Sequence, residues 1–317
     1  MDEKPDRPSA IRHYRGLARK IVRKHFGTPA SRLVYRSSGR TNYVFVINHV
    51  DGQFVVRISP DPERVDTFLK ERWVTEAVRK AGVPSPEVLA VGNDIGAEPY
   101  MIARRVTGTE ASHHPKRKRI IQQMGRFAAT INSIHTTSFG ANFDWTNNRE
   151  KHHTWGDYLK KEFQIDQRIE FFEKHRLLPK TVLEQLIGTI EASRSTRFKP
   201  SLNHSDLRLK NVIVDEDGEI AAIVDWEECI STIAPQWELS IALHDLSIDE
   251  KQLFIEGYGL NNRHIEQMAP LIKAFNIINY HSVAAEAIEQ RDHAKLAEIK
   301  LRLHGALDLY SLSDGAR

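Results

Sequence analysis

The spacing of the apolar residues changes near residue 108 of this 317-residue chain, and the change limits the folds open to it. Before residue 108, apolar residues alternate with polar ones or run together in short segments rich in Val, Ile, Tyr and Phe, which is typical of strands. After it, they recur every three or four positions, which is typical of amphipathic helices. Strands followed by helices predict an α+β protein and not alternating βα units.

The first hundred residues predict one antiparallel sheet of five strands. The strand segments are RLVYRSS, NYVFVINHV, QFVVRIS, EVLAVGN and PYMIARRV, with helices expected at 12–26 and 64–81. Asp51-Gly52 lies between the second and third strands. This pair predicts a tight turn, because Gly tolerates the positive φ that such a turn needs.

The rest of the chain is predicted to be mainly helical. Helices are expected at 117–137, 155–174, 179–193 and from Trp237 to about residue 313. One β-hairpin interrupts them, in which VIVD and IAAIVD are joined by a turn around DEDGE. We therefore expect a small sheet-rich N-terminal lobe, residues 1–104, and a larger helical C-terminal lobe, residues 105–317.

Several features of the composition exclude classes of protein. The segment MDEKPDRPSA is polar, unlike a signal peptide, and no apolar run reaches the roughly 18 residues of a membrane span. The single cysteine, Cys229, rules out a disulfide within the chain and fits a reducing compartment. The basic run 116–119 precedes one amphipathic helix without interleaved aromatic residues. We therefore expect a cytoplasmic protein with neither a membrane nor a nucleic-acid partner.

Charge is unevenly distributed, although the net charge is only +3. Residues 1–40 carry eleven Lys and Arg side chains against three acids, and residues 206–256 carry thirteen acids against three bases. A basic region suits phosphates, and an acidic region suits metal ions or cationic ligands. Two solvated faces would give the same pattern, so the distribution alone leaves both interpretations open.

Residues 203–226 read NHSDLRLKNVIVDEDGEIAAIVDW and place polar residues at fixed positions around the hairpin. The hairpin should bring Asn211, before its first strand, near Asp225, after its second. One oxygen from each suits Mg²⁺, which takes few protein ligands and keeps waters and substrate phosphates. Asp206 precedes the hairpin, where its carboxylate would meet a substrate hydroxyl, and His204 would hold this loop by hydrogen bonds.

These residue types are those that phosphoryl transfer requires. The transferred group has a loose transition state, so the protein mainly positions the reactants and neutralises charge. Besides the carboxylate and the metal ion, a cation must steady the phosphates. Arg57, at the end of an apolar strand, is the candidate, and Glu71 on the next helix would pair with it. The alternatives are an ordinary surface salt bridge for this pair and purely structural roles for the loop residues.

The chain resembles the aminoglycoside phosphotransferases, small-molecule kinases with a bilobal, protein-kinase-like fold, and among them the hygromycin-type enzymes. The resemblance rests on GQFVVRIS, VPSPEVLAVG, PYMIARRVTG, TWGDYL and NHSDLRLKNVIVDEDGEIAAIVDWEE, in this order, over roughly residues 35–245. The last of these segments is specific, and the others support it.

The resemblance implies a role for each matching residue. Asp206 matches the catalytic aspartate, and Asn211 and Asp225 match the two metal ligands. Arg57 and Glu71 match the phosphate-binding cation and its helix partner. The turn that covers the nucleotide phosphates matches Ser38, Gly39, Thr41 and Asn42. The hinge whose backbone binds the purine matches Arg104 and Val106. Without the resemblance, these six residues would equally suit a simple hairpin turn and an ordinary strand end.

Two residues and one loop depart from the family pattern. Ser205 stands where Gly is common. Arg57 stands where Lys is frequent, which keeps the charge but replaces a compact ammonium with a planar fork. The phosphate-covering turn has a single Gly and no G-x-G-x-x-G pattern.

The resemblance implies an enzyme that, with Mg²⁺, transfers a phosphoryl group from ATP or GTP to a hydroxyl of an aminoglycoside-like acceptor, as a monomer or homodimer. The acids after Asp206 would suit such a polycation, or would serve only solubility and metal binding. A kinase of a metabolic hydroxyl compound or of a macrolide is an alternative on the same fold. A non-catalytic nucleotide-binding protein is the alternative from another class. A protein kinase is disfavoured, because helix is expected within about ten residues of Trp226 and leaves no activation segment.

Overall fold

The computed structural model describes residues 8–37, 41–141 and 152–311. The chain forms two compact units: residues 1–111 with 210–227, and residues 112–209 with 228–317. Each unit has a hydrophobic core of its own. The division into functional lobes at residue 104 stays a prediction.

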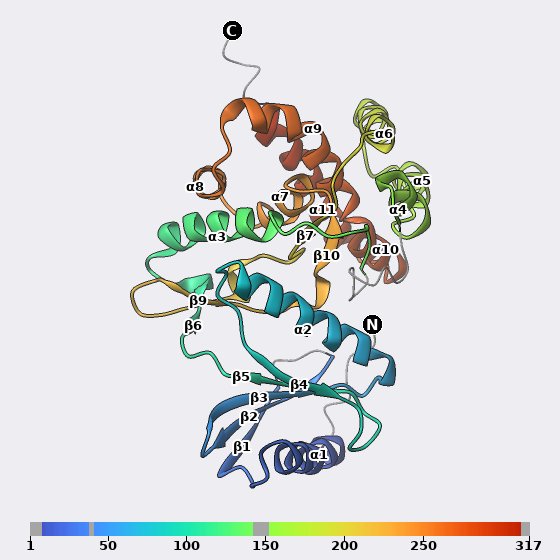
Figure 1. Cartoon of the computed structure of the whole chain (residues 1–317). Helices are drawn as coiled ribbons and strands as arrows, with labels where there is room; N and C mark the ends of the chain where they lie inside the picture. The colour runs from blue at the N-terminus through green and yellow to red at the C-terminus, as the bar shows by residue number, and fades with distance from the viewer. Residues whose placement is uncertain (1–7, 38–40, 142–151, 312–317) are drawn as a thin grey trace. The chain divides into compact units, whose positions relative to one another are not determined.

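The first unit is built on a five-stranded antiparallel sheet (Figure 1). Its strands, in spatial order, are β1 (Arg32–Arg36), β2 (Tyr43–His49), β3 (Gly52–Ile58), β5 (Tyr100–Arg104) and β4 (Val88–Gly92). Gly52 follows the tight turn between β2 and β3 with a φ of 128°, a conformation open to Gly and rarely to other residues. All five predicted strands and their antiparallel pairing are confirmed.

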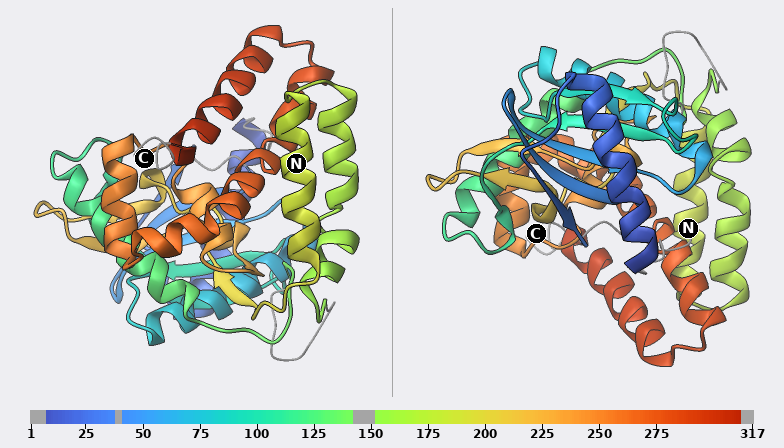
Figure 2. Two further views of the ribbon diagram at one scale, coloured as in Figure 1. Left: turned by 90° about the horizontal axis from the view of Figure 1, so that it is seen from above. Right: turned by 90° about the horizontal axis from the view of Figure 1, so that it is seen from below.

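Helix α1 (Pro8–Phe26) packs on the sheet and crosses its strands in the right-hand view of Figure 2. Alternate residues of β3, Phe54, Val56 and Ile58, are buried in the core that this helix shares with the sheet. Since neighbouring residues of a strand point to opposite faces, Arg57 lies on the other face. There α2 (Val65–Lys80) packs against β4 and β5, and its Phe68 ring lies 5.4 Å from Arg57 Cζ.

A smaller sheet in the same unit contains the predicted hairpin. β8 (Val212–Val214) pairs with β9 (Ile220–Ile223) on one side and with β6 (Thr109–Glu110) on the other. Asp215 Oδ1 closes the turn by accepting hydrogen bonds, each 2.9 Å long, from the backbone N–H groups of Asp217 and Glu219. The hairpin is confirmed, whereas β6 is too short to give a sequence pattern.

The second unit is mainly helical. Its helices are α3 (Arg117–Asn132), α4 (Trp155–Lys161), α5 (Ile165–Lys174), α6 (Lys180–Arg194), α7 (Gln236–Ala242), α8 (Ile248–Tyr258), α9 (Asn262–Ile278), α10 (His281–Glu289) and α11 (His293–Ser311). Two short antiparallel strands, β7 (Ser201–Asn203) and β10 (Ile230–Thr232), accompany them. Aromatic rings fill the core, where Trp237 lies 5.1 Å from Phe163 and 5.3 Å from Phe275 between centroids.

Helices α3 and α8 approach each other closely at two glycines. A Cβ atom on Gly125 of α3 would lie 2.1 Å from the carbonyl oxygen of Phe254, and one on Gly257 of α8 would lie 2.0 Å from that of Gln122. Both neighbouring atoms belong to backbone, which has little room to move. These positions therefore require glycine at this helix spacing.

Residues 155–174 are helical as predicted except at 162–164, so two helices stand there and not one. Gln164 has a φ of 53° and separates α4 from α5. Apolar residues on both helices enter the same core, so the helical pattern continues across the break. Elsewhere the predicted α+β class is confirmed, with an antiparallel sheet in the N-terminal region and helices in the C-terminal region. Within the described residues, no helix has the length and apolar character needed to span a membrane.

Candidate active site

The first unit contains a cleft of about 290 Å³ beside its sheet. Its apolar walls come from β3, β4 and β5 on one side and from the hairpin on the other. The apolar lining residues include Val55, Val88, Met101, Ala103, Ile213 and Val224. An apolar cleft of this kind suits the base of a nucleotide, because ligand pockets are mostly apolar with a few polar groups at defined places.

Polar residues gather on the wall of the same cleft. Arg57, Glu71 and Asp225 line it together with Arg104 and Val106. The cleft therefore brings together five residues that the sequence singled out. The backbone N–H of Arg104 already donates to the carbonyl oxygen of Glu87 at 2.8 Å.

Arg57 is held by carboxylates. Its Nη1 donates to Glu71 Oε2 at 2.6 Å, and its Nη2 lies 3.5 Å from Glu227 Oε2. Burial lowers the pKa of Arg57, but Glu71, Glu227 and Asp225 together raise it above its usual value. Burial raises the pKa of Glu71, against the opposing effect of Arg57. Arg57 is thus a permanently charged cation at a fixed position, as predicted, while its role stays a proposal.

Glu227 also binds a second arginine. Arg64 Nη1 donates to Glu227 Oε2 at 3.0 Å, so this carboxylate bridges Arg57 and Arg64. Neither Arg64 nor Glu227 was predicted from the sequence. The only sequence signal is the position of Glu227, two residues after Asp225.

The ends of the hairpin lie together, as predicted. The backbone N–H of Val224 donates to the carbonyl oxygen of Asn211 at 2.9 Å, one residue before Asp225. Asn211 is buried and Asp225 is partly exposed. Asp225 has a φ of 67°, a conformation that Asp tolerates better than most residues.

These residues fit a Mg²⁺ ion that shares its coordination with phosphates. Within the described residues, no three His, Cys, Asp or Glu side chains are grouped so as to hold a metal ion without other ligands. Two oxygen-bearing side chains close together suit Mg²⁺, which completes its shell with waters and substrate phosphates. Asn211 and Asp225 would be the residues that hold it.

In the second unit, Asp206 lies on a loop that is fixed from both sides. The backbone N–H of Asp206 donates to Nδ1 of the fully buried His204 at 3.3 Å. Ser205 between them has a φ of 64°, a conformation in which Gly would be unstrained. Trp237 Nε1 donates to Ser205 Oγ at 3.1 Å and so holds the side chain of Ser205.

Glu238 supports the same loop from the start of α7. Its Oε2 accepts a hydrogen bond of 2.6 Å from the backbone N–H of His204, and its side chain is fully buried. Burial raises the pKa of Glu238 to about 7, while hydrogen bonds from His204 and Ser205 lower it and Asp206 raises it further. Glu238 therefore fixes the position of Asp206 indirectly, by holding the backbone of the loop that carries Asp206.

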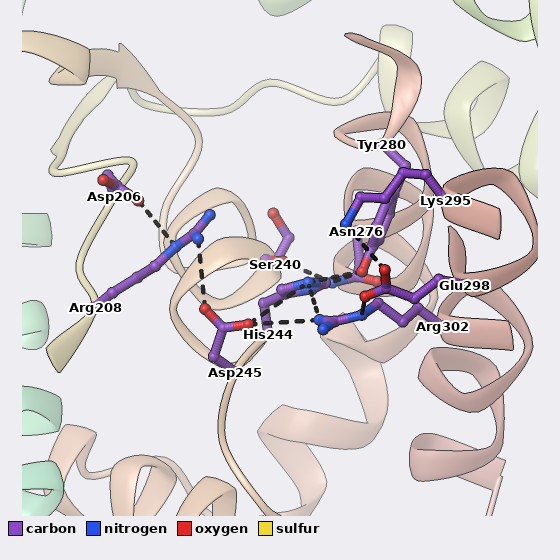
Figure 3. A network of polar contacts seen from close by, with 10 residues as sticks. All are labelled: Asp206, Arg208, Ser240, His244, Asp245, Asn276, Tyr280, Lys295, Glu298 and Arg302. Atoms are coloured by element: carbon purple, nitrogen blue, oxygen red, sulfur yellow. Dashed lines mark hydrogen bonds and ion pairs between the residues drawn. The ribbon is translucent and has the colours of Figure 1, made fainter. Parts of the chain in front are cut away.

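Asp206 is also the first member of a charged network (Figure 3). Its Oδ1 lies 2.9 Å from Nε of Arg208, whose Nη1 lies 3.4 Å from Oδ2 of Asp245. Arg302 of α11 continues the network, with Nη1 3.6 Å from Asp245 Oδ1. Arg208, Asp245 and Arg302 line a pocket of about 320 Å³ among α7, α9, α10 and α11. This pocket was not predicted from the sequence, because its residues are scattered over almost a hundred positions.

The remaining predicted residues lie apart from these groups or outside the described part. Thr41 and Asn42 precede β2, and neither lines the cleft. Ser38 and Gly39 lie outside the described residues.

Comparison with known proteins identifies the class. Residues 33–271 match the model of a family described as the phosphotransferase enzyme family. The match covers well over half of the chain, so the chain belongs to this family.

Individual relatives agree with this assignment. The Escherichia coli hygromycin-B 4-O-kinase is 25% identical over 213 residues, which are 63% of this chain and 58% of that enzyme. The match thus spans less than two thirds of the relative's length.

Solved structures of aminoglycoside phosphotransferases have the same fold. A thermostable mutant of APH(4)-Ia, in a ternary complex with AMP-PNP and hygromycin B, superposes with a TM-score of 0.67 at 19% identity, over 92% of this chain and 98% of that one. The GDP complex of aminoglycoside 2'-phosphotransferase-IIIa gives a TM-score of 0.65 at 16% identity, over 93% of this chain and 97% of that one. The resemblance to aminoglycoside phosphotransferases and the kinase-like fold are therefore confirmed.

Proposed function

We propose that this phosphotransferase transfers the γ-phosphoryl group of a nucleoside triphosphate to a hydroxyl group of a small molecule. The observation that carries the proposal is the cleft in the first unit, which joins an apolar slot to Arg57, Glu71 and Asp225. Asp206 precedes Asn211 in the sequence and lies on a loop that hydrogen bonds of His204 and Glu238 hold in place. Solved relatives hold AMP-PNP or GDP, which supports ATP or GTP as the donor.

Each residue has a defined task in the proposal. Arg57, oriented by Glu71, steadies the phosphates, and Asn211 and Asp225 hold the metal ion. Mg²⁺, when bound, would neutralise negative charge on the phosphates. Asp206 orients the acceptor hydroxyl and accepts its proton, and His204 and Glu238 keep Asp206 in place. Backbone groups near Arg104 and Val106 and the turn at residues 38–42 are assigned to the nucleotide.

Two acceptor classes are candidates. The names of the relatives favour an aminoglycoside of the hygromycin type. A hydroxyl-bearing metabolite is the second candidate, and the charges around the pocket beside Asp206 favour it. Location in the cytoplasm and a monomeric or homodimeric state stay predictions.

The proposal is tested by incubating the protein with Mg²⁺, ATP or GTP, and a panel of aminoglycosides, sugars and hydroxy acids. Mass spectrometry should find an acceptor heavier by one phosphoryl group, with formation of the nucleoside diphosphate. Binding of nucleotide without phosphorylation of any member of the panel would favour the alternative of a non-catalytic nucleotide-binding protein. A protein that binds neither ATP nor GTP would overturn the proposal.

A further inference from the structure

The pocket of the second unit begins next to Asp206, because Arg208 lines it and contacts the Asp206 carboxylate at 2.9 Å. Resting on the proposed function, we infer that this pocket receives the acceptor, and that the acceptor is a hydroxyl-rich compound carrying an anionic group, a carboxylate or a phosphate. The inference concerns the charge of the substrate, and it runs against a polycationic acceptor.

The lining residues carry more cations than carboxylates. Among the described residues, the charged side chains of the wall are Arg208, Lys295, Arg302, Asp245 and Glu298. Burial lowers the pKa of His244, the histidine of the wall, and Arg302, Arg208 and Lys251 lower it further against the opposing effect of Asp245. The wall thus carries three cations against two carboxylates, and the carboxylate of Asp206, which does not line the pocket, is a further partner of Arg208.

Both carboxylates of the wall are already paired with two cations each (Figure 3). Asp245 lies 3.4 Å from Arg208 and 3.6 Å from Arg302, and Glu298 lies 3.0 Å from both Arg302 and Lys295. An ammonium group of a substrate would compete with these cations for the same carboxylate oxygens and would add positive charge beside them. An anionic group would not, because an arginine has five N–H donors and these contacts use only some of them.

Acids elsewhere in the acidic region are also engaged. Glu227 bridges Arg57 and Arg64, Glu238 supports the loop before Asp206, and Glu250 caps α8 by accepting from Ser247 N–H at 2.9 Å. The excess of acids between residues 206 and 256 therefore does not translate into an acidic pocket. The number of acids in this part of the sequence would have suggested an acidic pocket.

Uncharged polar groups of the wall suit the rest of such a substrate. Tyr280, Asn276 and Asn279 line the pocket, and the Tyr280 hydroxyl lies 2.7 Å from His244 Nε2. Amide and phenol groups exchange hydrogen bonds with hydroxyl groups in either direction. The volume of about 320 Å³ lies within the range of small-molecule pockets.

Binding measurements with matched probes test the inference without requiring phosphoryl transfer. Calorimetry at low salt, with ADP and Mg²⁺ present, would compare glucose, gluconate, glucose 6-phosphate and hygromycin B. We expect gluconate or glucose 6-phosphate to bind at least about tenfold more tightly than glucose, because a hydrogen bond to a charged group is stronger than one to a neutral group. Tighter binding of gluconate would identify the anionic group as a carboxylate, and tighter binding of glucose 6-phosphate would identify it as a phosphate.

Arg302→Glu reverses one charge of the wall and is the decisive variant. It should abolish the preference for the anionic probe, and Lys295→Glu should reduce it. Lys300→Glu is the matched control, since Lys300 is exposed on the same helix and does not line the pocket. It should retain the preference.

The two proposals fail in different ways. If hygromycin B binds and Arg302→Glu tightens its binding, or if no anionic probe binds better than glucose, the inference on charge is wrong. If hygromycin B is phosphorylated in that case, the proposed function survives. If anionic probes bind as expected but neither ATP nor GTP binds, the preference of the pocket for anions stands, and the proposed function is overturned together with the role of the pocket as acceptor site.

Discussion

Two buried carboxylates position the charged groups of the candidate site without being expected to touch substrate. Glu71 fixes Arg57 through a hydrogen bond of 2.6 Å, and Glu238 fixes the loop of Asp206 through a backbone N–H at the same distance. Glu71 was predicted as the partner of Arg57, because it follows on the next helix. The place of Glu238 at the start of a helix after Pro235 favours a supporting role behind the site, but not the hydrogen bond to His204, since 34 positions separate them. Motif residues are thus predictable one by one, whereas the side chains that hold them require the fold.

Asp225→Ala removes one of the two proposed metal ligands. Mg²⁺ should strengthen binding of ADP to the wild-type protein and should have little effect on the variant, whose affinity with Mg²⁺ should be at least about tenfold lower. Calorimetric titrations with and without Mg²⁺ measure both quantities. Asp217→Ala, in the exposed turn of the same hairpin, makes the same charge change and should behave like the wild type. An unchanged effect of Mg²⁺ in Asp225→Ala would contradict the assignment.

Glu238→Gln removes a buried charge and keeps an oxygen that accepts from His204. Because burial raises the pKa of Glu238 from 4.5 to about 7, the folded protein holds this proton more tightly than the unfolded chain. The resulting stability is fully present below pH 4.5 and is lost as the pH rises through 7. The variant lacks this loss, so its free energy of unfolding relative to wild type should rise by roughly 1–3 kcal/mol between about pH 5 and 8.

Urea unfolding at several pH values measures this difference. Glu184→Gln makes the same change at an exposed position of α6 and should show almost no dependence on pH. A difference between Glu238→Gln and the wild type that stayed constant from about pH 5 to 8 would show that Glu238 does not titrate as described.

At the scale of elements, the sequence predicted most strands and helices but not how closely they pack. The five strands, the hairpin and α1, α2 and α6 follow from local patterns of apolar residues. The break between α4 and α5 was missed, because it depends on the positive φ of Gln164 and not on hydrophobicity. The strands β6, β7 and β10 were missed as well, since two or three residues give no periodicity.

Gly257→Ala tests the close approach of α3 and α8. A methyl group there would lie 2.0 Å from the carbonyl oxygen of Gln122, so the helices must separate. The free energy of unfolding should fall by about 1–3 kcal/mol, as is usual when a packed interface is overfilled. Gly188→Ala, in α6, is the control, because its Cβ would meet no atom within 4 Å. It should stabilise the protein by about 0.5–1 kcal/mol, since Ala favours helix over Gly. Equal effects of the two changes in a urea titration would contradict the packing described.

For the whole molecule, the sequence predicted the fold class and the family correctly. The segments NHSDLRLKNVIVDEDGEIAAIVDWEE and GQFVVRIS carried that prediction, because their spacing is set by one local hairpin and one strand. The pocket beside Asp206 could not be predicted from local sequence patterns. Its walls come from helices up to a hundred residues away, and its charge depends on which acids are paired with Arg208, Arg302 and Lys295.

The most direct test of the proposed phosphoryl transfer is a single-turnover experiment with Asp206→Ala. Wild type and variant would be mixed with Mg²⁺, radiolabelled nucleoside triphosphate and an acceptor found by the panel, and the labelled product would be followed with time. The variant should bind the nucleotide nearly as tightly as the wild type and transfer phosphate roughly 10²–10⁴-fold more slowly, which is the usual contribution of a positioned proton acceptor. Transfer by the variant at a rate near that of the wild type would contradict the account.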